Sequence, residues 1–317
     1  MKIVDFTYAH ITEATALALA NYEEERRHVP ALPQIDAVLN LSKFADNKLG
    51  VAALDGDKMV GFLCSYKPFN NAFGSTRTKG IFSPMDGNAA TRKNRAKIYA
   101  AMYEEAAKKW VQAGAVIHAV NLYAHDTAAQ HQFYLYGFGL RCVDAIRSMD
   151  EIIAPHCTGY DFSELAPDEL PQILPLDHML DAHMAASPTF ILRPSDTQEA
   201  LAKKIGHFQS TFFVAKHEGK IVAYLRAELD GETFLCDTSG YLHIKGAYCL
   251  PEYRGKGLNQ ILLSLLIQKL RTQGYVRLGV DFESINPTAY GFWLKHFDAY
   301  THSVVRRIDE NILEADI

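Results

Sequence analysis

The spacing of hydrophobic positions predicts where the chain forms strands and helices. In residues 212–229, FFVAKHEG followed by KIVAYLRAEL, two apolar runs flank a Glu-Gly pair, which predicts a β-hairpin. Residues 258–273 instead carry leucines and isoleucines on one broad face at helical spacing, and Gly274 follows as a C-cap. A strand that ends at Leu250 precedes this helix, and a further strand over 276–284 comes after it.

The first half of the chain repeats this order of elements. A strand and a helix over residues 3–27 come first, followed by a hairpin formed by 49–56 and 58–66. A strand over 79–82 and a long helix over 98–114 follow. In both halves the chain then continues with a strand, a short helix and a last strand. This order predicts a mixed α/β or α+β domain that is used twice.

Short sequence matches support an internal repeat. FYLYGF, Phe133–Phe138, corresponds to FWLKHF, Phe292–Phe297. At the same offset, RSMDEII, Arg147–Ile153, corresponds to RRIDENI, Arg306–Ile312, with matching Arg, Asp, Glu and Ile. Two segments that match in one register are not expected by coincidence, so the halves are predicted to be copies of one fold.

The segment between the copies, IIAPHCTGYDF, carries Pro and Gly and has no helical period. We therefore place the domain boundary there. The expected domains are residues 1–152 and residues 160–317.

Composition narrows the class of protein. The 317 residues are 48% hydrophobic and 22% charged, which is typical of a globular protein. A net charge of -5 with scattered Lys and Arg argues against nucleic acid as a partner and favours a small molecule. The N-terminus lacks a signal-peptide pattern and no apolar run reaches roughly 18 residues, so we expect a cytoplasmic protein without a membrane partner. Its five widely spaced cysteines are expected to be reduced.

The turn PEYRGKGLNQIL, Pro251–Leu262, is the main candidate for chemistry. It joins a strand to a helix, where free backbone N–H groups and the positive end of the helix dipole converge. Gly255 and Gly257 permit close approach of an anion, and Arg254 and Lys256 add positive charge. The spacing matches neither a Walker loop nor a dinucleotide motif. Taken alone, the turn fits a solvated helix start equally well.

The order of elements around this turn adds a resemblance. The strand, the RGKGLN turn, the long helix, the next strand and then NPTAYGFW, Asn286–Trp293, resemble the GCN5-related N-acetyltransferase (GNAT) family. The matching positions are Arg254, Gly257 and Asn286, while Asn259 departs from the family's Gly or Ala. The resemblance implies two tandem acyl-CoA N-acyltransferase-like domains, each a central mixed sheet flanked by helices.

In this family the loop amides hold the pyrophosphate of the acyl donor, and the end of the preceding strand pairs with the pantetheine arm. The resemblance therefore implies an acetyl-CoA site in the second half and requires no metal. The implied cofactor-binding residues are Cys249, Leu250, Arg254, Gly255, Lys256, Gly257, Leu258, Asn259, Asn286 and Trp293.

The first half lacks the glycines of this turn. Counted back from Gly114, the positions that face Arg254, Gly255 and Gly257 are Asn94, Arg95 and Lys97. We expect a structural or acceptor-binding role for this half rather than a second acyl-CoA site.

The catalytic groups are less well marked. Trp293 occupies the place of the tyrosine that often protonates the departing thiolate in the family, and an indole is no useful acid near neutral pH. By the same offset, the corresponding residue of the first half is Tyr134. Tyr290 is the preferred substitute acid, with His296 as the alternative.

A base must remove a proton from the attacking amine, and donors must stabilise the oxyanion. Glu283 is the preferred base, with Asp281 and His243 as alternatives. By analogy with the family, the backbone N–H near Leu250 is the expected oxyanion donor.

Three functions remain open. The first is N-acetyl transfer to a primary amine of a small molecule or peptide, by a monomer or homodimer. The second is an acyl-CoA-binding regulatory module without turnover, and the third a structural duplication without ligand. The thirteen histidines lack metal-site spacing, and no GxSxG motif supports a hydrolase.

Overall fold

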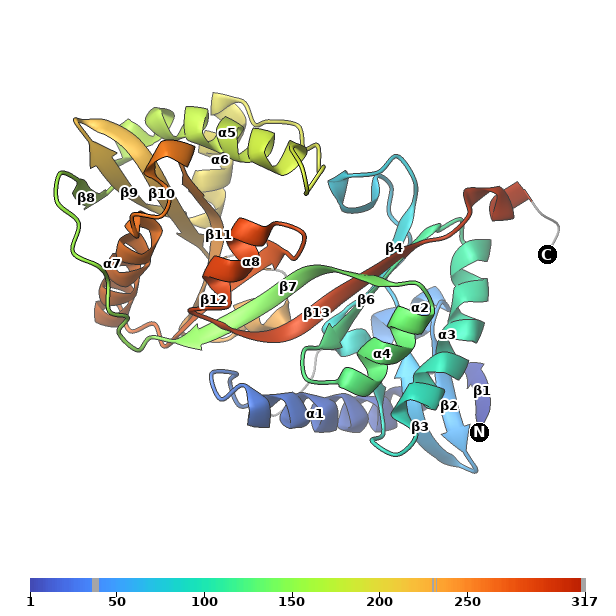
Figure 1. Cartoon of the computed structure of the whole chain (residues 1–317). Helices are drawn as coiled ribbons and strands as arrows, with labels where there is room; N and C mark the ends of the chain where they lie inside the picture. The colour runs from blue at the N-terminus through green and yellow to red at the C-terminus, as the bar shows by residue number, and fades with distance from the viewer. Residues whose placement is uncertain (36–39, 230, 232, 315–317) are drawn as a thin grey trace. The chain divides into compact units, whose positions relative to one another are not determined.

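The structure is a computed structural model that describes residues 1–35, 40–229, 231 and 233–314 (Figure 1). The chain forms two compact units. Unit 1 comprises Met1–Val143 together with Ala299–Ile317, and unit 2 comprises Asp144–Asp298.

Both units are built from a mixture of helices and strands, as the sequence predicts. The elements of the first part of the chain are β1 (Lys2–Asp5), α1 (Ile11–His28), α2 (Ser42–Asn47), β2 (Val51–Asp55), β3 (Lys58–Leu63), β4 (Gly80–Ser83), β5 (Asn88–Ala90), α3 (Arg95–Gln112), β6 (Ile117–Tyr123), α4 (Thr127–Leu135) and β7 (Gly139–Ser148). The remaining elements are β8 (Asp161–Glu164), α5 (Leu174–Ala185), α6 (Gln198–Phe208), β9 (Thr211–His217), β10 (Lys220–Glu228), β11 (Tyr241–Cys249), α7 (Leu258–Thr272), β12 (Arg277–Glu283), α8 (Pro287–Trp293) and β13 (Asp298–Arg307).

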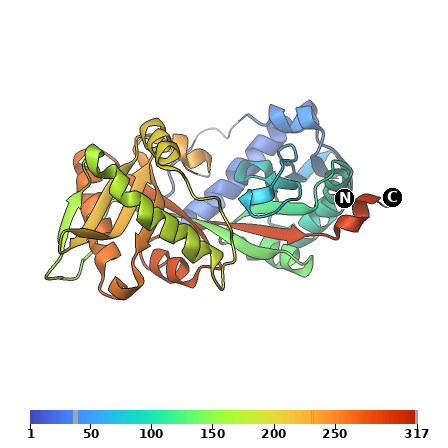
Figure 2. The same cartoon turned by 90° about the horizontal axis from the view of Figure 1, so that it is seen from above.

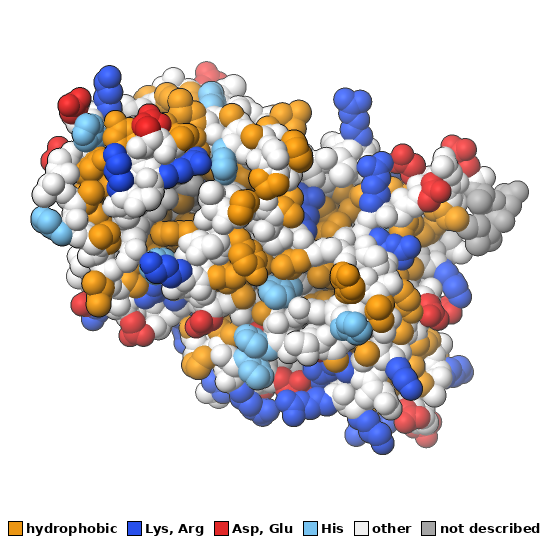
Figure 3. Space-filling view, viewed as in Figure 1, with side chains coloured by type: hydrophobic (Ala, Val, Ile, Leu, Met, Phe, Trp, Pro, Cys, Tyr) orange, Lys and Arg blue, Asp and Glu red, His pale blue; other side chains and the backbone are white. Residues whose placement is uncertain are grey.

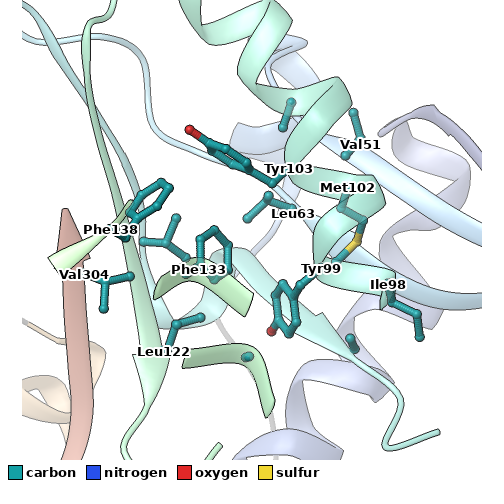
Figure 4. Packing of buried hydrophobic residues seen from close by; sticks show 14 of the residues in the cluster. Val51, Leu63, Ile98, Tyr99, Met102, Tyr103, Leu122, Phe133, Phe138 and Val304 are labelled. Carbon is teal, nitrogen blue, oxygen red and sulfur yellow. The ribbon is translucent and has the colours of Figure 1, made fainter. Parts of the chain in front are cut away.

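In unit 1, strands β1, β2, β3 and β5 form an antiparallel sheet in that order. Alternate residues of β3 point to opposite faces because side chains along a strand have a period of two. Leu63 packs with Met102 and Tyr103 of α3, whereas Phe62 packs with Ala18 of α1. The sheet therefore has a hydrophobic core on each face, and Figure 4 shows the core beside α3.

In unit 2 the strands run in the order β7-β12-β11-β10-β9-β8. The pairs from β11 to β8 are antiparallel, whereas β11 and β12 are parallel. Helix α5 lies across one face of these strands (Figure 2), and Leu176 on it packs with Phe212 and Tyr224. Helix α7 packs against β9, β10 and β11 with a face that includes Leu262 and Leu266.

Strands β11 and β12 separate before they end. Their parallel pairing covers Tyr241–Ile244 and Arg277–Val280, although β11 continues to Cys249 and β12 to Glu283. On the other side of β11, a bulge shifts the register so that Arg226 faces Gly246 while the next residue faces Ile244. A bulge bends its strand and increases the local twist. The far end of β11 is thereby turned away from β12.

The units differ from the two continuous ranges, 1–152 and 160–317, that the repeat suggests. Unit 1 includes the C-terminal strand β13, whose residues Thr301–Arg307 pair antiparallel with Ile117–Tyr123 of β6. Unit 2 begins at Asp144, inside β7. The repeat locates a boundary along the sequence, but it carries no information on which strand the last strand of each copy joins.

The long helices confirm one expectation and correct another. Helix α7 covers Leu258–Thr272, and Gly274 follows it with a φ of 84°. Helix α3 begins earlier than expected, at Arg95, so Lys97 lies within its first turn. The residue directly before α3 is Asn94, with a φ of 61°, which matches Gly257 before α7, with a φ of 81°. Asn94, rather than Lys97, is thus the counterpart of Gly257.

Two helices between residues 160 and 210, α5 and α6, have no counterpart in the sequence prediction.

On the face shown in Figure 3, Lys and Arg side chains lie in several separate places with acidic side chains among them. Among the described residues, no helix is long and apolar enough to span a bilayer.

Candidate functional site

A cavity of about 460 Å³ lies in unit 2 beside the start of α7. Helix α5, the end of β11, the following turn, and helices α7 and α8 all contribute to it. The lining residues are Leu180, His183, Ala247, Tyr248, Cys249, Tyr253, Arg254, Gly255, Gly257, Leu258, Asn259, Gln260, Thr288, Ala289, Phe292 and Trp293.

The turn before α7 depends on its two glycines. Gly255 has a φ of 77° and Gly257 a φ of 81°, a region of backbone conformation that residues with a Cβ rarely adopt. A Cβ on Gly255 would meet no atom within 4 Å, whereas a Cβ on Gly257 would lie 2.4 Å from Cγ of Pro155. Gly257 thus permits the positive φ of the turn and also leaves room for Pro155 of the preceding linker. The N–H groups of Leu258 and Asn259 lie beside the cavity in the first turn of α7, where a helix offers no carbonyl partner, whereas the N–H of Gln260 donates to the carbonyl of Gly257 at 3.0 Å.

The two cations of the turn have different surroundings. Nε of Arg254 donates to the carbonyl of Cys249 at 3.0 Å, and its guanidinium lies 5.5 Å from the ring centre of Tyr248. Arg254 thus holds the turn against the end of β11 and lines the cavity. Nζ of Lys256 donates to the hydroxyl of Tyr160 at 3.1 Å, and this lysine is outside the lining.

Of the remaining residues expected to bind the donor, some line the cavity and others do not. Cys249 and Leu258 are buried to 8% and 2% exposure, and burial raises the pKa of the Cys249 thiol to about 11. Both line the cavity, as does Asn259, whose side-chain oxygen is buried. Leu250 is outside the lining, and its N–H donates to the carbonyl of Val222 at 2.9 Å.

Helix α8 contributes Trp293 to the cavity but not Asn286. Oδ1 of Asn286 caps α8: it accepts from the N–H of Ala289 at 3.4 Å and from the hydroxyl of Thr288 at 2.7 Å. The Trp293 ring packs edge-on against Phe292, with ring centres 4.8 Å apart. Trp293 is therefore an apolar wall of the cavity.

Neither residue preferred for catalysis lines the cavity. Glu283 is ion-paired with Arg193 at 3.0 Å, and its side chain is 11% exposed. The ring of Tyr290 packs edge-on against Phe282 at 6.0 Å and is 37% exposed. The alternative acid His296 also lies outside the lining, and burial lowers its pKa.

The alternative bases form an ion pair between the buried His243 and the partly exposed Asp281. Nε2 of His243 lies 2.7 Å from Oδ1 of Asp281, and Nζ of Lys245 is 3.4 Å from the same oxygen. Burial alone would lower the pKa of His243, but hydrogen bonds with Asp281 and Cys236 raise it to about 9. Burial opposes ionisation of Asp281 as well, yet hydrogen bonds from His243 and Lys245 hold its pKa below its usual range. His243 therefore already carries its proton at neutral pH, and the ion-paired Asp281 is too weakly basic to take one, so neither is suited to deprotonate an amine.

The proposed correspondence of Tyr134 with Trp293 is corrected by the helix caps. Helix α4 is capped by Asp126 and α8 by Asn286, and at equal distance from these caps stand Phe133 and Trp293. Phe133 is buried to 1% exposure, as Trp293 is to 5%, whereas Tyr134 is 71% exposed. An extra residue near the end of α4 shifts the comparison when it is counted from the later FYLYGF match.

The structure adds His183, which the sequence did not nominate. It lies near the end of α5, and its Nε2 is 3.4 Å from both Oδ1 of Asn286 and Oγ1 of Thr288. It is the histidine of the cavity lining. The helical spacing of Leu176, Leu180 and Met184 could have predicted the helix, but not that its end faces the turn.

Unit 1 has a smaller cavity, of about 210 Å³, at the corresponding place beside the starts of α3 and α4. The Arg95 guanidinium is bound there by three partners: the carbonyl of Ala90 at 3.1 Å, Glu24 at 2.9 Å and Asp126 at 3.2 Å. Burial raises the pKa of Asp126 and of the neighbouring Glu25. Carboxylates from α1 and from the cap of α4 thus line this cavity, and no glycine does among the described residues.

The described residues include no group of three or more His, Cys, Asp or Glu side chains arranged to hold a metal ion.

Comparison with protein-family models gives a match over residues 177–298, to the model described as the acetyltransferase (GNAT) family. The matched segment runs from α5 to the start of β13. It therefore includes every residue that lines the cavity of unit 2.

Solved structures share the fold. A GCN5-related N-acetyltransferase from Sphaerobacter thermophilus superposes with a TM-score of 0.61 at 14% identity, over 96% of this chain and 95% of that one. The glucosamine N-acetyltransferase region of a fungal multi-domain β-N-acetylglucosaminidase gives a TM-score of 0.53 at 12% identity, over 96% of this chain and 38% of that one. At these identities the likeness shows the fold alone.

Proposed function

We propose, from the GNAT acetyltransferase domain that residues 177–298 form, that unit 2 transfers an acetyl group from acetyl-CoA to a primary amine of a small molecule or peptide. The observation that carries this proposal is the convergence of the glycine turn, the free end of β11 and the first turn of α7 on one cavity.

The turn and the start of α7 hold the pyrophosphate of the donor in this proposal. The backbone N–H groups around Gly255 and Gly257 supply the donors, and the helix dipole supplies further positive potential. Arg254 adds charge from the cavity wall. Because the N–H of Asn259 does not depend on its side chain, this departure from the family pattern leaves the cradle intact.

The separation of β11 from β12 supports a site for the donor's arm. Beyond Ile244, β11 is no longer paired with β12, so an extended pantetheine chain can pair with the backbone near Cys249 as a strand would. The thioester then lies between the two strands. The N–H of Leu250, the expected oxyanion donor, already donates to the carbonyl of Val222, so it is not proposed for this role.

His183 is the proposed base. It is the imidazole on the wall of the cavity, and the nearby oxygens of Asn286 and Thr288 restrict its orientation. It takes the proton that the amine loses on attacking the thioester. Glu283 and Tyr290 stay as the second proposed base and acid, acting from outside the lining.

A matched pair of variants tests donor binding. Gly255 has open space around its Cβ position and a positive φ that Asn and Asp tolerate better than other residues. Gly255→Asn and Gly255→Asp therefore share their shape and strain and differ by one negative charge. We expect the Asp variant to bind acetyl-CoA at least roughly tenfold more weakly than the Asn variant, by isothermal titration calorimetry. Equal affinities would place the pyrophosphate elsewhere.

The second candidate, an acyl-CoA-binding module without turnover, is favoured by one observation. Trp293 is a buried apolar wall where the family often has a proton donor. Thiol release from acetyl-CoA over a panel of amines separates the two functions. Acetyl-CoA binding without amine-dependent thiol release on any amine would favour the module.

A further inference from the structure

A second cluster of chemically reactive side chains lies in unit 2, outside the lining of the cavity. It contains Cys236 in the short helical turn Phe234–Asp237, Tyr241 and His243 on β11, and Asp281 on β12. The proposed acetyl transfer uses none of these side chains.

Two glycines make room for this cluster. A Cβ on Gly279 would lie 1.7 Å from the Tyr241 hydroxyl and 2.9 Å from Nδ1 of His243. A Cβ on Gly231 would lie 2.0 Å from Sγ of Cys236 and 3.0 Å from the same Nδ1. The thiol, the phenol and the imidazole thus converge on one point, which any larger residue at 231 or 279 would obstruct.

Hydrogen bonds connect the members of the cluster. His243 is held protonated by Asp281, with its pKa raised to about 9, so both ring nitrogens carry hydrogen at neutral pH. Burial raises the pKa of Tyr241 well above its usual range, so the phenol keeps its proton as well. Nδ1 of His243 lies 2.8 Å from the Tyr241 hydroxyl, and Cys236 is hydrogen-bonded with both residues. When Nδ1 of His243 donates to the Tyr241 oxygen, the phenol proton is left to donate to the Cys236 sulfur.

We propose that Cys236, His243 and Asp281 form a Cys–His–Asp set in which Cys236 is a nucleophilic thiol that exchanges with small disulfides. The inference does not depend on the acetyl transfer proposed above. An imidazole beside a cysteine, oriented by a third group, is the usual arrangement of an activated nucleophile, and here Asp281 orients His243 through a contact of 2.7 Å.

The proposed reaction is a thiol–disulfide exchange. The thiolate of Cys236 attacks one sulfur of the reagent, whose S–S bond breaks as the new S–S bond forms. The other half of the reagent leaves as a thiolate, and the proton that Cys236 gave up passes to solvent. No oxidant other than the disulfide is required.

The chain supplies its own reference cysteines. Cys64 and Cys249 are buried, and burial raises the pKa of both thiols. Cys142 and Cys157 are partly buried, as Cys236 is. A difference in rate among these three therefore reports their chemical surroundings more than their access to solvent.

The test uses the full reduced chain with dithiobis(nitrobenzoate) at pH 7. Released nitrothiobenzoate gives the total rate, and mass spectrometry of quenched samples assigns it to each cysteine. We expect Cys236 to react at least roughly tenfold faster than Cys142 and Cys157. A Cys236 rate equal to or below theirs would overturn the proposal.

Two variants connect the rate to the cluster. His243→Gln retains hydrogen bonding but carries no charge, and it should lower the Cys236 rate to that of Cys157 while the rates of Cys142 and Cys157 stay unchanged. Asp281→Asn should also lower the Cys236 rate, because His243 loses the partner that keeps its ring protonated. Asp281 is partly exposed, with a side-chain accessibility of 24%, so this variant tests the proposal if His243→Gln does not fold. A folded variant of either kind, judged by circular dichroism, that keeps the native Cys236 rate contradicts it.

Discussion

The two units place a cavity beside the start of their long helix, but they line it in opposite ways. In unit 2 the turn before α7 contributes glycines and the exposed Arg254. In unit 1 the cavity is lined by the buried Arg95, the first residue of α3, which is neutralised by Glu24 and Asp126. An arginine that already has two carboxylate partners offers little charge to a phosphate. Both units therefore keep a cavity beside the long helix, but unit 1 has an internal ion cluster there, whereas unit 2 has the proposed anion site.

The largest expected effect is a loss of unit 1 stability on replacement of Arg95. Arg95→Met leaves Glu24 and Asp126 without their buried cation, and loss of one partner of a buried ion pair costs about 3 to 5 kcal/mol. We expect a loss of that order in the free energy of unfolding of unit 1, measured by urea denaturation.

Arg92→Met is the matched control for this variant. Arg92 also pairs with Glu24, but its side chain is 73% exposed, so we expect a loss below about 1 kcal/mol. If both variants lost the same stability, Arg95 would not be the centre of the cluster.

The C-terminal ends of helix α5 in unit 2 and helix α1 in unit 1 differ in the side chains that they contribute to the cavities. Helix α5 of unit 2 places His183 in the cavity, whereas α1 of unit 1 places Glu24 and Glu25 there. If His183 is the base, His183→Asn should lower kcat by about 100-fold, with acetyl-CoA affinity nearly unchanged. His178→Asn is the control, because His178 is on the same helix but is bound to the Asp196 carbonyl at 2.8 Å. Equal effects of the two substitutions would remove His183 from the mechanism and leave Glu283 as the base.

Replacing Arg254 by Met allows a direct comparison with Arg95→Met. Arg254 is exposed and packs on Tyr248, so Arg254→Met should leave stability almost unchanged. Because it removes the cation of the proposed phosphate site, acetyl-CoA should bind about tenfold more weakly, by calorimetry. A stability loss as large as that of Arg95→Met would mean that Arg254 has the same structural role.

Two buried histidines predict opposite effects of pH on the units. Burial lowers the pKa of His118 in unit 1 to about 4, so its stabilising contribution is present above pH 6.5 and is lost as pH falls toward 4. His243 in unit 2, with its pKa raised to about 9, contributes stability that is complete below pH 6.5 and is lost as pH rises through 9.

We expect His118→Gln to reduce the acid-induced fall of the unit 1 melting temperature, and His243→Gln to reduce the alkaline fall of unit 2, each by a few degrees. Calorimetric scans from pH 4 to pH 10 would measure both. A pH profile unchanged by either substitution would assign the dependence to other groups.

Local sequence features predicted much of the fold and part of the site. The hairpins, the long helices and the glycine turn follow from periodicity and from residues with special backbone freedom, such as Gly257 and Gly274. The lining of the cavity by His183 was not predictable in this way, since α5 reaches the turn only through packing on Tyr224 and Tyr248. The roles of Arg254 and Asn286 as ties within the turn and the helix cap likewise depend on neighbours brought near by the fold.

Periodicity and residue type alone indicate that two similar sets of elements are present and that only the second has a glycine turn before its long helix. These are local properties, because they depend on side-chain period and on allowed φ angles. Only the tertiary structure decided that β13 pairs with β6, that Asn94 is the counterpart of Gly257, and that His243 and Asp281 neutralise each other. Strand pairing and the burial of charge join residues that are far apart in the chain, and no local pattern records which partner each will find.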